Sequence, residues 1–559
     1  MTPSRSLAQL DGGPQAPYGS SVWSILQNGV DVNPDRAALI SAQQPPGHLG
    51  HLVGPGLVQS PAVRGPDEIL TWSYAQMRRG AARLATVLAR HGVPPHSTLL
   101  SFIPHSAEWA LLLWVSAVRC LTVISQMPQA LRLPEKTAEL RTCFAMMPAV
   151  IVVQDEAAAQ LVDETKAAPQ PARTSNDTTP PFLGLCLSRL SEPRRGWISL
   201  ADVAEMSFTD SESAINPSDV DDRLDRVAQI FFTSGSSGTP KGVPKTVKNL
   251  AACTATMADP QPGSTVGVII GGNFAALAST MPLLLENRNF SLEKITSLRR
   301  IVLGGEIITK DFLSRAREVL PGPVVLPGFG MSEVAGLFGW LGGVPDPIPN
   351  YNGVVSCGKP LPGTRIRVVN EKGLVASLGE AGEMHVGTEG TVERYMHTQP
   401  GGKSDTFYED EFGPWFTTGD ISVLDEAGYV YIVGRKKELI RNVTGIIQPH
   451  TIESCLSAAF NVQTCVVALP SPMNGDVPYP IVARLPEGVS PGDMREHFIN
   501  AVGSSYSLGT ILTLEQLGMK SWPLTATGKV FKRELERAAV ECMRKDPRLG
   551  LASYAIASS

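Results

Sequence analysis

Residues 231–242 read FFTSGSSGTPKG, and they continue directly from a short apolar run, VAQIFF, at residues 227–232. A run of branched and aromatic residues predicts a buried β-strand. The glycines and serines that follow predict a loop at the end of that strand, which is where ligands bind in open α/β sheets. Pro240 and Gly242 exclude a Walker A loop, which requires glycine before its lysine and serine or threonine after it.

This loop has the chemistry of a polyphosphate site. Gly235 and Gly238 allow the backbone to bend and to approach a ligand closely, and Lys241 adds a positive charge. Hydroxyl groups that can donate hydrogen bonds are supplied by Thr233, Ser234, Ser236, Ser237 and Thr239. An isolated Ser/Gly segment is usually a solvated linker, but this one is held between a predicted strand and Pro240-Lys241. We therefore predict a phosphate-binding loop.

The bulk composition is that of an ordinary globular protein with more than one domain. A length of 559 residues exceeds what a single hydrophobic core usually supports. The net charge of −5 and the absence of a dense Lys/Arg run give no sign of a nucleic-acid surface. The eight cysteines are scattered without a C-x-x-C pair, which argues against a zinc ribbon or a disulfide framework and favours reduced thiols.

The sequence gives no targeting or membrane signal. The N-terminus has no long apolar segment of the secretory type, and Ala557-Ser558-Ser559 is not the Ser-Lys-Leu peroxisomal address. The most apolar stretch, residues 103–127, contains proline and charged residues, so it predicts a buried helix rather than a membrane span. We expect a cytoplasmic protein.

Helical and strand patterns alternate through the first half of the chain, which predicts an α/β fold with mainly parallel sheets and flanking helices. A helix is predicted around residues 77–88, ending near His91-Gly92, and another at 106–121. Strands are predicted at 99–103, 149–153, 300–303 and 324–326. Residues 157–181, rich in Ala, Pro, Thr and Asp, predict a surface insertion.

A domain boundary is predicted after Gly434. Residues 423–433 indicate a hairpin whose turn is residues 425–428. Charged residues follow at 435–438, and a new α/β pattern then runs to the end. We therefore predict a large domain at residues 1–434 and a small α+β domain at residues 435–559.

The loop at residues 231–242 resembles the phosphate loop of the adenylate-forming superfamily. That family contains acyl- and aryl-CoA ligases, firefly luciferases and the adenylation domains of nonribosomal peptide synthetases. Further segments resemble its motifs in the same order, and the resemblance covers about residues 22–537. It implies that residues 233–239 and Lys241 hold the phosphates of ATP, and that the small domain is mobile.

Two segments resemble the family's adenine and metal motifs. Gly304-Gly305-Glu306 resembles the segment that lies against adenine. Phe329-Gly330-Met331-Ser332-Glu333 resembles an aromatic-Gly-x-Thr-Glu motif, with Phe and Ser replacing the commoner Tyr and Thr. The resemblance places Gly330 and Met331 beside the nucleotide. It implies that Phe329 stacks on adenine, Ser332 donates to the α-phosphate and Glu333 binds Mg²⁺, tasks that suit a ring, a hydroxyl and a carboxylate.

Five residues of the second half complete the resemblance. In Thr417-Thr418-Gly419-Asp420, Asp420 matches the carboxylate that accepts hydrogen bonds from the ribose hydroxyls. In the hinge segment GRKKELI, residues 434–440, Arg435 would contact the ribose and Lys437 stands at the family's pivot. Gly445 resembles part of the pantetheine tunnel of CoA ligases. PLTATGK, residues 523–529, matches the family's P-x-T-x-x-G-K loop and makes Lys529, together with Lys241, the expected catalytic lysines.

The activity implied by the resemblance is activation of a carboxylic acid. ATP and Mg²⁺ would give an acyl-adenylate and pyrophosphate, and CoA would then give a thioester and AMP. Low lysine content and Pro/Ala-rich insertions favour fungal specialised metabolism. The alternatives are an adenylation enzyme that loads a carrier protein, a luciferase-like oxygenase and a catalytically impaired nucleotide-binding relative. An α/β hydrolase is disfavoured because G-x-S-x-G fails at its last position in both candidate segments.

One region departs from the family pattern. The interval between Lys241 and Gly304 is several tens of residues shorter than in other members, with the loss around residues 250–290. The missing part carries the acyl pocket of the family. A lost exon, a truncated pocket and a degenerate relative all explain it, and the identity of the acid therefore stays open.

Overall fold

The computed structural model describes most of the chain. The described residues are 6–15, 17–19, 21–41, 44–56, 58, 69–133, 136–167, 182–213, 220, 222–233, 241–257, 273–277, 300–334, 336–396, 406–442, 445–471, 475–502, 508–524, 530–546 and 549. Two groups of predicted site residues lie outside these ranges: Ser234, Gly235, Ser236, Ser237, Gly238 and Thr239 of the phosphate loop, and Lys529.

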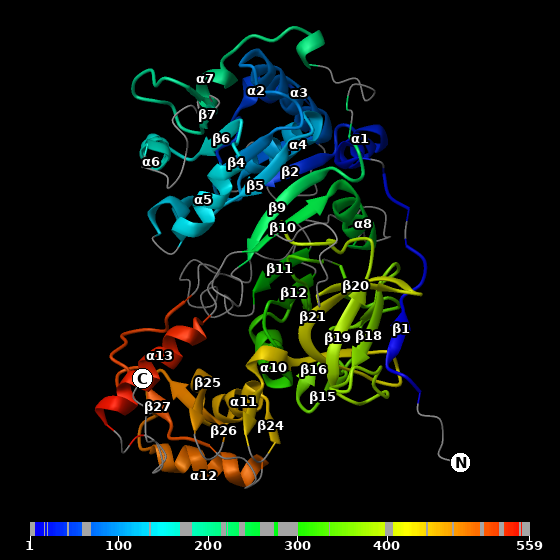
Figure 1. Cartoon of the computed structure of the whole chain (residues 1–559). Coiled ribbons are helices and arrows are strands. Elements are labelled where there is room, and N and C mark those ends of the chain that lie inside the picture. The colour runs from blue at the N-terminus through cyan, green and yellow to red at the C-terminus, as the bar shows by residue number, and fades with distance from the viewer. Residues whose placement is uncertain are drawn as a thin grey trace.

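A seven-stranded sheet forms one end of the molecule (Figure 1). Its order is β10-β9-β5-β4-β6-β7-β8, and every neighbouring pair is parallel except β10 and β9. The strands are β4 (Thr98–Phe102), β5 (Thr122–Ser125), β6 (Val150–Val153), β7 (Leu183–Cys186), β8 (Trp197–Ser199), β9 (Val227–Thr233) and β10 (Lys241–Thr246). The strands predicted at 99–103, 149–153 and 227–232 are therefore confirmed.

Helices cover both faces of this sheet because side chains alternate along each strand. Leu99 packs with α3 (Tyr74–Arg90) and α4 (Ala107–Val118) on one face. Its neighbour Leu100 packs with α5 (Thr137–Ala145) and α6 (Glu156–Ala167) on the other. The α3 helix begins with a capping box between Ser73 and Gln76, and Gly92 with φ +76° follows its end, as the sequence predicts.

Two sequence predictions about this region need correction. The supposed insertion at 157–181 begins with the regular helix α6, whose Ala159 and Val162 are fully buried, and residues 168–181 lie outside the described ranges. Strand β9 is only alternately buried: Ala228 and Ile230 are in the core, whereas Phe231 is exposed. The reason is that β9 lies next to the edge strand β10.

The first part of the chain adds smaller elements around this sheet. They are α1 (Val22–Val32), β2 (Ala37–Ser41), α2 (Gly50–Val53), β3 (Leu70–Ser73), α7 (Leu200–Ala204) and α8 (Val247–Met257), whereas β1 (Gln9–Asp11) pairs with residues 365–367 of a different, antiparallel sheet. The α1 to α3 helices share the core on the α4 face.

A second parallel sheet of three strands follows. Its order is β11 (Asn273–Leu277), β12 (Arg300–Gly304) and β13 (Val324–Pro327), which confirms the strands predicted at 300–303 and 324–326. The helix α10 (Lys310–Val319) packs Leu313 and Ala316 against it. The neighbouring strands β12 and β13 end side by side, so the segments that follow them lie close together.

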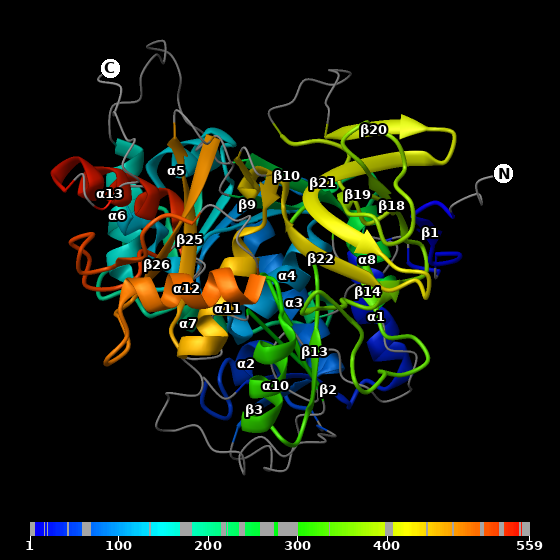
Figure 2. The same cartoon turned by 90° about the horizontal axis from the view of Figure 1, so that it is seen from below.

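An antiparallel sheet forms the third layer. It contains β1, β18 (Arg365–Val369), β19 (Gly382–Gly387), β21 (Gly413–Leu424), β20 (Phe407–Asp410) and β22 (Val430–Arg435). The predicted hairpin at 423–433 is the β21–β22 pair. Register shifts against β19 and β22 accompany the visible curvature of β21 (Figure 2). Short pairs join β14 (Phe338–Gly339) to β17 (Lys359–Pro360) and β15 (Asn350–Tyr351) to β16 (Val354–Val355).

Residues 436–549, which we call the C-terminal part, form a separate layer at the other end of the molecule (Figure 1). Its five-stranded sheet contains β23 (Ile440–Asn442), β24 (Gly445–Ile447), β25 (Thr464–Ser471), β26 (Gly475–Val482) and β27 (Leu512–Thr513). The helices are α11 (Pro449–Phe460), α12 (Pro491–Val502) and α13 (Lys532–Lys545). The fold is therefore α/β with a large N-terminal and a small C-terminal part, as predicted.

No helix in the described ranges has the length and the apolar character that a bilayer crossing requires. The apolar stretch at 103–127 instead supplies the buried helix α4 and the strand β5.

Candidate functional site

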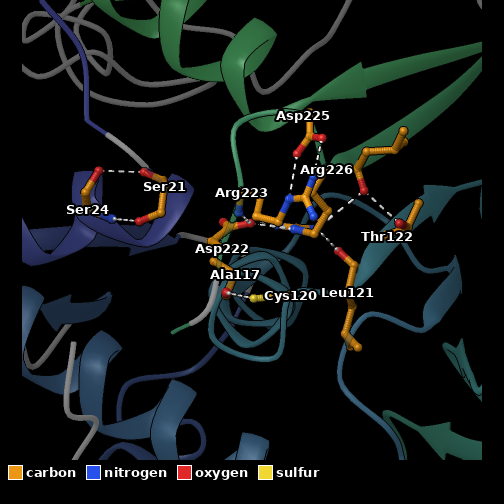
Figure 3. Close-up of polar contacts among 11 residues, drawn as sticks. Ser21, Ser24, Ala117, Cys120, Leu121, Thr122, Asp222, Arg223, Asp225 and Arg226 are labelled. Carbon is orange, nitrogen blue, oxygen red and sulfur yellow. Dashed lines mark hydrogen bonds and ion pairs between the residues drawn. The ribbon is translucent and has the colours of Figure 1, made fainter. Parts of the chain in front are cut away.

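A buried ion pair fixes the start of β9, the strand that leads into the phosphate loop (Figure 3). Arg226 Nε lies 2.6 Å from Asp222 Oδ1, and the two side chains are 10% and 0% exposed. Arg226 Nη1 also donates to the Leu121 carbonyl at 2.9 Å, and Thr122 Oγ1 donates to the Val227 carbonyl at 2.7 Å. These contacts hold the start of β9 against the α4–β5 connection. They therefore also determine where β9 ends, at Thr233.

The phosphate loop connects the two strands of a hairpin. Lys241 of β10 is paired with Thr233 of β9, so both ends of the loop lie at the same edge of the sheet. The sequence prediction did not include β10, in which Pro244 and two lysines weaken the strand signal.

Tyr395 joins the predicted phosphate lysine to the predicted metal carboxylate. Lys241 Nζ lies 4.7 Å from the centre of the Tyr395 ring, and the Tyr395 hydroxyl donates to Glu333 Oε1 at 2.8 Å. Burial, together with the Glu333 carboxylate, raises the pKa of Tyr395, so its hydroxyl keeps its proton. Tyr395 was missed in the sequence, where a tyrosine between charged and apolar neighbours gives no signal of its own.

Backbone contacts hold the segment that carries Tyr395 along β10 and α8. The Met396 N–H donates to the Gly242 carbonyl at 2.9 Å. Asn249 Nδ2 donates to the carbonyls of Glu389 and Thr391, both at 2.8 Å. Lys245 is buried beneath the same segment, and burial lowers its pKa to about 8.

The predicted adenine segments lie at the ends of neighbouring parallel strands. Gly304 ends β12, and Gly305 follows it with φ +85°. The Gly328 N–H donates to the Leu303 carbonyl at 2.7 Å, and a Cβ on Gly304 would lie 2.9 Å from the Gly328 oxygen. The close approach of the two turns therefore depends on glycine, and Glu306 is exposed beside them.

Residues 329–333 continue from the second of these strands. Phe329 is half-buried and packs against Phe338, with ring centres 5.8 Å apart. Gly330 is exposed, and Ser332 is half-buried. The backbone of Met331 and Val334 forms a tight turn that positions Glu333 between them. No group of three or more metal-ligating side chains occurs among the described residues, so Glu333 is a single carboxylate candidate.

The predicted ribose carboxylate has an unused acceptor atom. Asp420 of β21 lies opposite Arg435 of β22, and Arg435 Nε lies 2.8 Å from Asp420 Oδ1. The Asp420 N–H donates to Thr418 Oγ1 at 3.0 Å. Asp420 Oδ2 is buried and has no hydrogen-bond partner in the described part of the chain. Burial raises the pKa of Asp420 to about 6, although the nearby Arg435 acts in the opposite direction.

The remaining predicted residues lie in the C-terminal part. Lys437 is exposed in a single 3₁₀ turn, and Gly445 begins β24 opposite Asn442. The ends of the predicted catalytic loop are closed by a bridge between Leu524 and Val530. Lys532, three residues beyond Lys529, has its Nζ 2.9 Å from Glu453 Oε1 and 4.0 Å from Glu438 Oε2.

Comparison with known proteins identifies relatives along the whole chain. The model of the family described as AMP-binding enzyme matches residues 57–268 and 273–396. An acyl–CoA ligase of Pestalotiopsis microspora, GME11374, is 28% identical over 591 aligned positions, which cover 95% of this chain and 98% of that protein.

Solved structures share the fold. ATP-bound MatB from Rhodopseudomonas palustris is 18% identical with a TM-score of 0.69, covering 92% of this chain and 98% of that one. O-succinylbenzoate coenzyme A synthetase (MenE) from Bacillus subtilis, in complex with ATP and magnesium ion, is 18% identical with a TM-score of 0.64. That match covers 92% of this chain and 99% of that one.

The buried ion pair under β9 predicts a large stability difference between two arginines. Arg226→Met should lower the free energy of unfolding by about 3–5 kcal/mol, because it leaves the Asp222 carboxylate buried without its partner. Arg223→Met removes the neighbouring exposed pair with Asp225, whose side chains are 71% and 70% exposed, and should cost no more than about 1 kcal/mol. Urea denaturation of both variants measures the difference, and equal losses would contradict the assignment.

Proposed function

The chain belongs to the family of AMP-binding enzymes, and on this basis we propose that it is an AMP-forming acid–thiol ligase. It uses ATP to convert a carboxylic acid to an acyl-adenylate with release of pyrophosphate. It then transfers the acyl group to the thiol of CoA and releases AMP. The observation that carries the proposal is that Lys241 and Glu333, the predicted phosphate-binding cation and the predicted metal-binding carboxylate, both contact Tyr395.

The N-terminal part binds the nucleotide. Residues 233–239 and Lys241 hold the β- and γ-phosphates, and Ser332 donates to the α-phosphate. The adenine lies between the 304–306 turn and Phe329, beside Gly330 and Met331. Asp420 accepts hydrogen bonds from the ribose hydroxyls, assisted by Arg435, and its buried Oδ2, which has no partner among the described residues, suits such a donor.

Stabilisation of negative charge on the phosphates lowers the barrier of the first step. The acid carboxylate attacks the α-phosphorus, and the bond from that phosphorus to the pyrophosphate oxygen breaks. Lys529 bridges the two negative groups, while Lys241 and the loop amides stabilise the leaving pyrophosphate. The carboxylate oxygens of Glu333 are ligands that suit Mg²⁺. When bound, Mg²⁺ would neutralise part of the negative charge of the ATP phosphates.

The second step requires the C-terminal part. The CoA sulfur attacks the acyl carbon, and the bond from that carbon to the AMP oxygen breaks. Lys437 is the pivot about which the C-terminal part turns between the steps, and Gly445 lies along the path of the pantetheine arm. In this assignment, residues 1–434 bind the nucleotide, and residues 435–559 supply Lys529 for the first step and the path of the pantetheine arm for the second.

A panel of carboxylic acids tests the reaction. Aliphatic, aromatic and polyketide-type acids are each supplied with ATP, and pyrophosphate exchange reports adenylation. We expect exchange with one class of acid, and with CoA added the corresponding thioester mass and AMP. A carrier protein tested in place of CoA should not be acylated faster. AMP binding without exchange for any acid would contradict the enzyme assignment and support a nucleotide-binding relative.

Lys529→Ala should lower the rate of adenylation about a hundredfold or more, because the developing negative charge loses its cation. Lys520→Ala is the matched control: Lys520 is an exposed lysine of the same part of the chain and has no assigned role. Both variants should retain the wild-type melting temperature. An unchanged exchange rate in Lys529→Ala would remove Lys529 from the catalytic machinery.

Nucleoside binding should depend on the ionisation of Asp420. The pKa of about 6 predicts that adenosine, which has no phosphate of its own to titrate, binds about tenfold more weakly near pH 5 than near pH 7. The folded carboxyl holds its proton more tightly than the unfolded one. Its stabilising contribution is therefore present at acid pH and lost as the pH rises through about 6. Calorimetric titration of adenosine into the wild type and Asp420→Asn near pH 5 and near pH 7 checks the predicted change in binding. The variant should bind adenosine weakly at both pH values.

A further inference from the structure

Lys245 and Lys241 project from the same side of β10, because alternate residues of a strand share a face. Lys241 lies over the Tyr395 ring. Lys245 is only 4% exposed, and its ammonium donates to the Glu333 carbonyl at 2.8 Å and to the Gly390 carbonyl at 2.9 Å. Between the two lysines, Val243 is fully buried.

A lysine is costly at such a position unless its charge is compensated. The strand packs into the core here, so an apolar side chain would satisfy the packing alone. The two carbonyls supply strong, charge-assisted hydrogen bonds that an apolar residue cannot form. Each carbonyl belongs to a different segment: Glu333 follows β13, and Gly390 lies between β19 and Tyr395.

We infer that Lys245 is a positioning residue for the metal-binding carboxylate. Its ammonium fixes the backbone of Glu333 and also the segment that carries Tyr395. Tyr395 in turn donates to Glu333 Oε1, so Lys245 holds the main-chain carbonyl of Glu333 and Tyr395 holds its carboxylate. The phosphate lysine and the metal carboxylate thereby keep a set separation. This inference depends on the proposed function, specifically on Mg²⁺ binding at Glu333.

The test is direct binding of a nucleotide that cannot react, at a fixed pH of about 7. Lys245→Met keeps the length and apolar stem of the side chain and removes the ammonium. In calorimetric titrations, this variant should bind α,β-methylene-ATP with Mg²⁺ about tenfold more weakly than the wild type. Its affinity for AMP should stay within about twofold, because AMP has no β- and γ-phosphates. With EDTA in place of Mg²⁺, the two proteins should bind α,β-methylene-ATP equally.

Glu108→Gln is the matched control for a general loosening of the structure. Glu108 of α4 is 7% exposed, and its carboxylate is bound by His48 Nε2 at 2.6 Å and by Gln44 Nε2 at 3.2 Å, away from β10 and the 389–396 segment. This variant should lose thermal stability while the ratio of Mg²⁺-nucleotide to AMP affinity stays that of the wild type.

The inference would be overturned by equal loss of AMP and Mg²⁺-nucleotide binding in Lys245→Met, by the same loss in EDTA, or by the same selective loss in Glu108→Gln. If the wild type itself shows no Mg²⁺-dependent binding, the proposed function fails instead. A wild type that depends on Mg²⁺ and a Lys245→Met variant identical to it would reject only the role of Lys245.

Discussion

Arg226 carries a charge that the fold buries almost completely, and the position of β9, which ends at Thr233 before the predicted phosphate loop, depends on how that charge is paired. Asp222 neutralises it from one side, and the Leu121 carbonyl accepts from the other. A buried pair of this kind adds little net stability compared with apolar packing, but it tolerates very little displacement of its partners. The start of β9 is therefore fixed relative to β5, and the strand delivers Thr233 to a defined place at the edge of the sheet.

The β9–β10 hairpin also connects two sheets between which the described residues form no backbone ladder. Along β10, side chains and carbonyls contact the 389–396 segment, which extends from the antiparallel sheet. Lys245 reaches the Glu333 carbonyl beyond the three-stranded sheet as well. The candidate site lies where these three layers meet. Its residues come from strand ends of different sheets, so small adjustments of the hairpin are transmitted to both Lys241 and Glu333.

Sequence patterns were sufficient where a feature depends on local residues. The VAQIFF strand, the short strands before residues 304–306 and 329–333, and the hairpin that presents Asp420 were all predicted from nearby patterns. Strand β10 was missed because KGVPKT has little strand propensity, and its conformation comes from pairing with β9 and burying Val243. The α6 helix was not predicted because the Ala-, Pro-, Thr- and Asp-rich composition of residues 157–181 is typical of an irregular insertion, although the first of these residues form a regular helix. Tyr395 and Lys245 acquire their roles from contacts with residues distant in sequence, which no local pattern encodes.

The ion pairs around Lys437 are arranged to suit its proposed role as a pivot. Arg435–Asp420 and Lys436–Glu383 lie entirely on the N-terminal side of residue 437. Lys532 and its partners Glu438 and Glu453 lie entirely on the C-terminal side. Rotation about Lys437 would leave the Arg435–Asp420 pair, the proposed ribose contact, intact and would move Lys532 together with Glu438 and Glu453. Arg441–Glu371 does span the pivot, but its side chains are 53% and 72% exposed, so breaking it costs at most about 1 kcal/mol. Among the described residues, the less exposed pairs Arg435–Asp420 and Lys532–Glu453 thus each lie within one part, and the ion pair that spans the pivot is an exposed one.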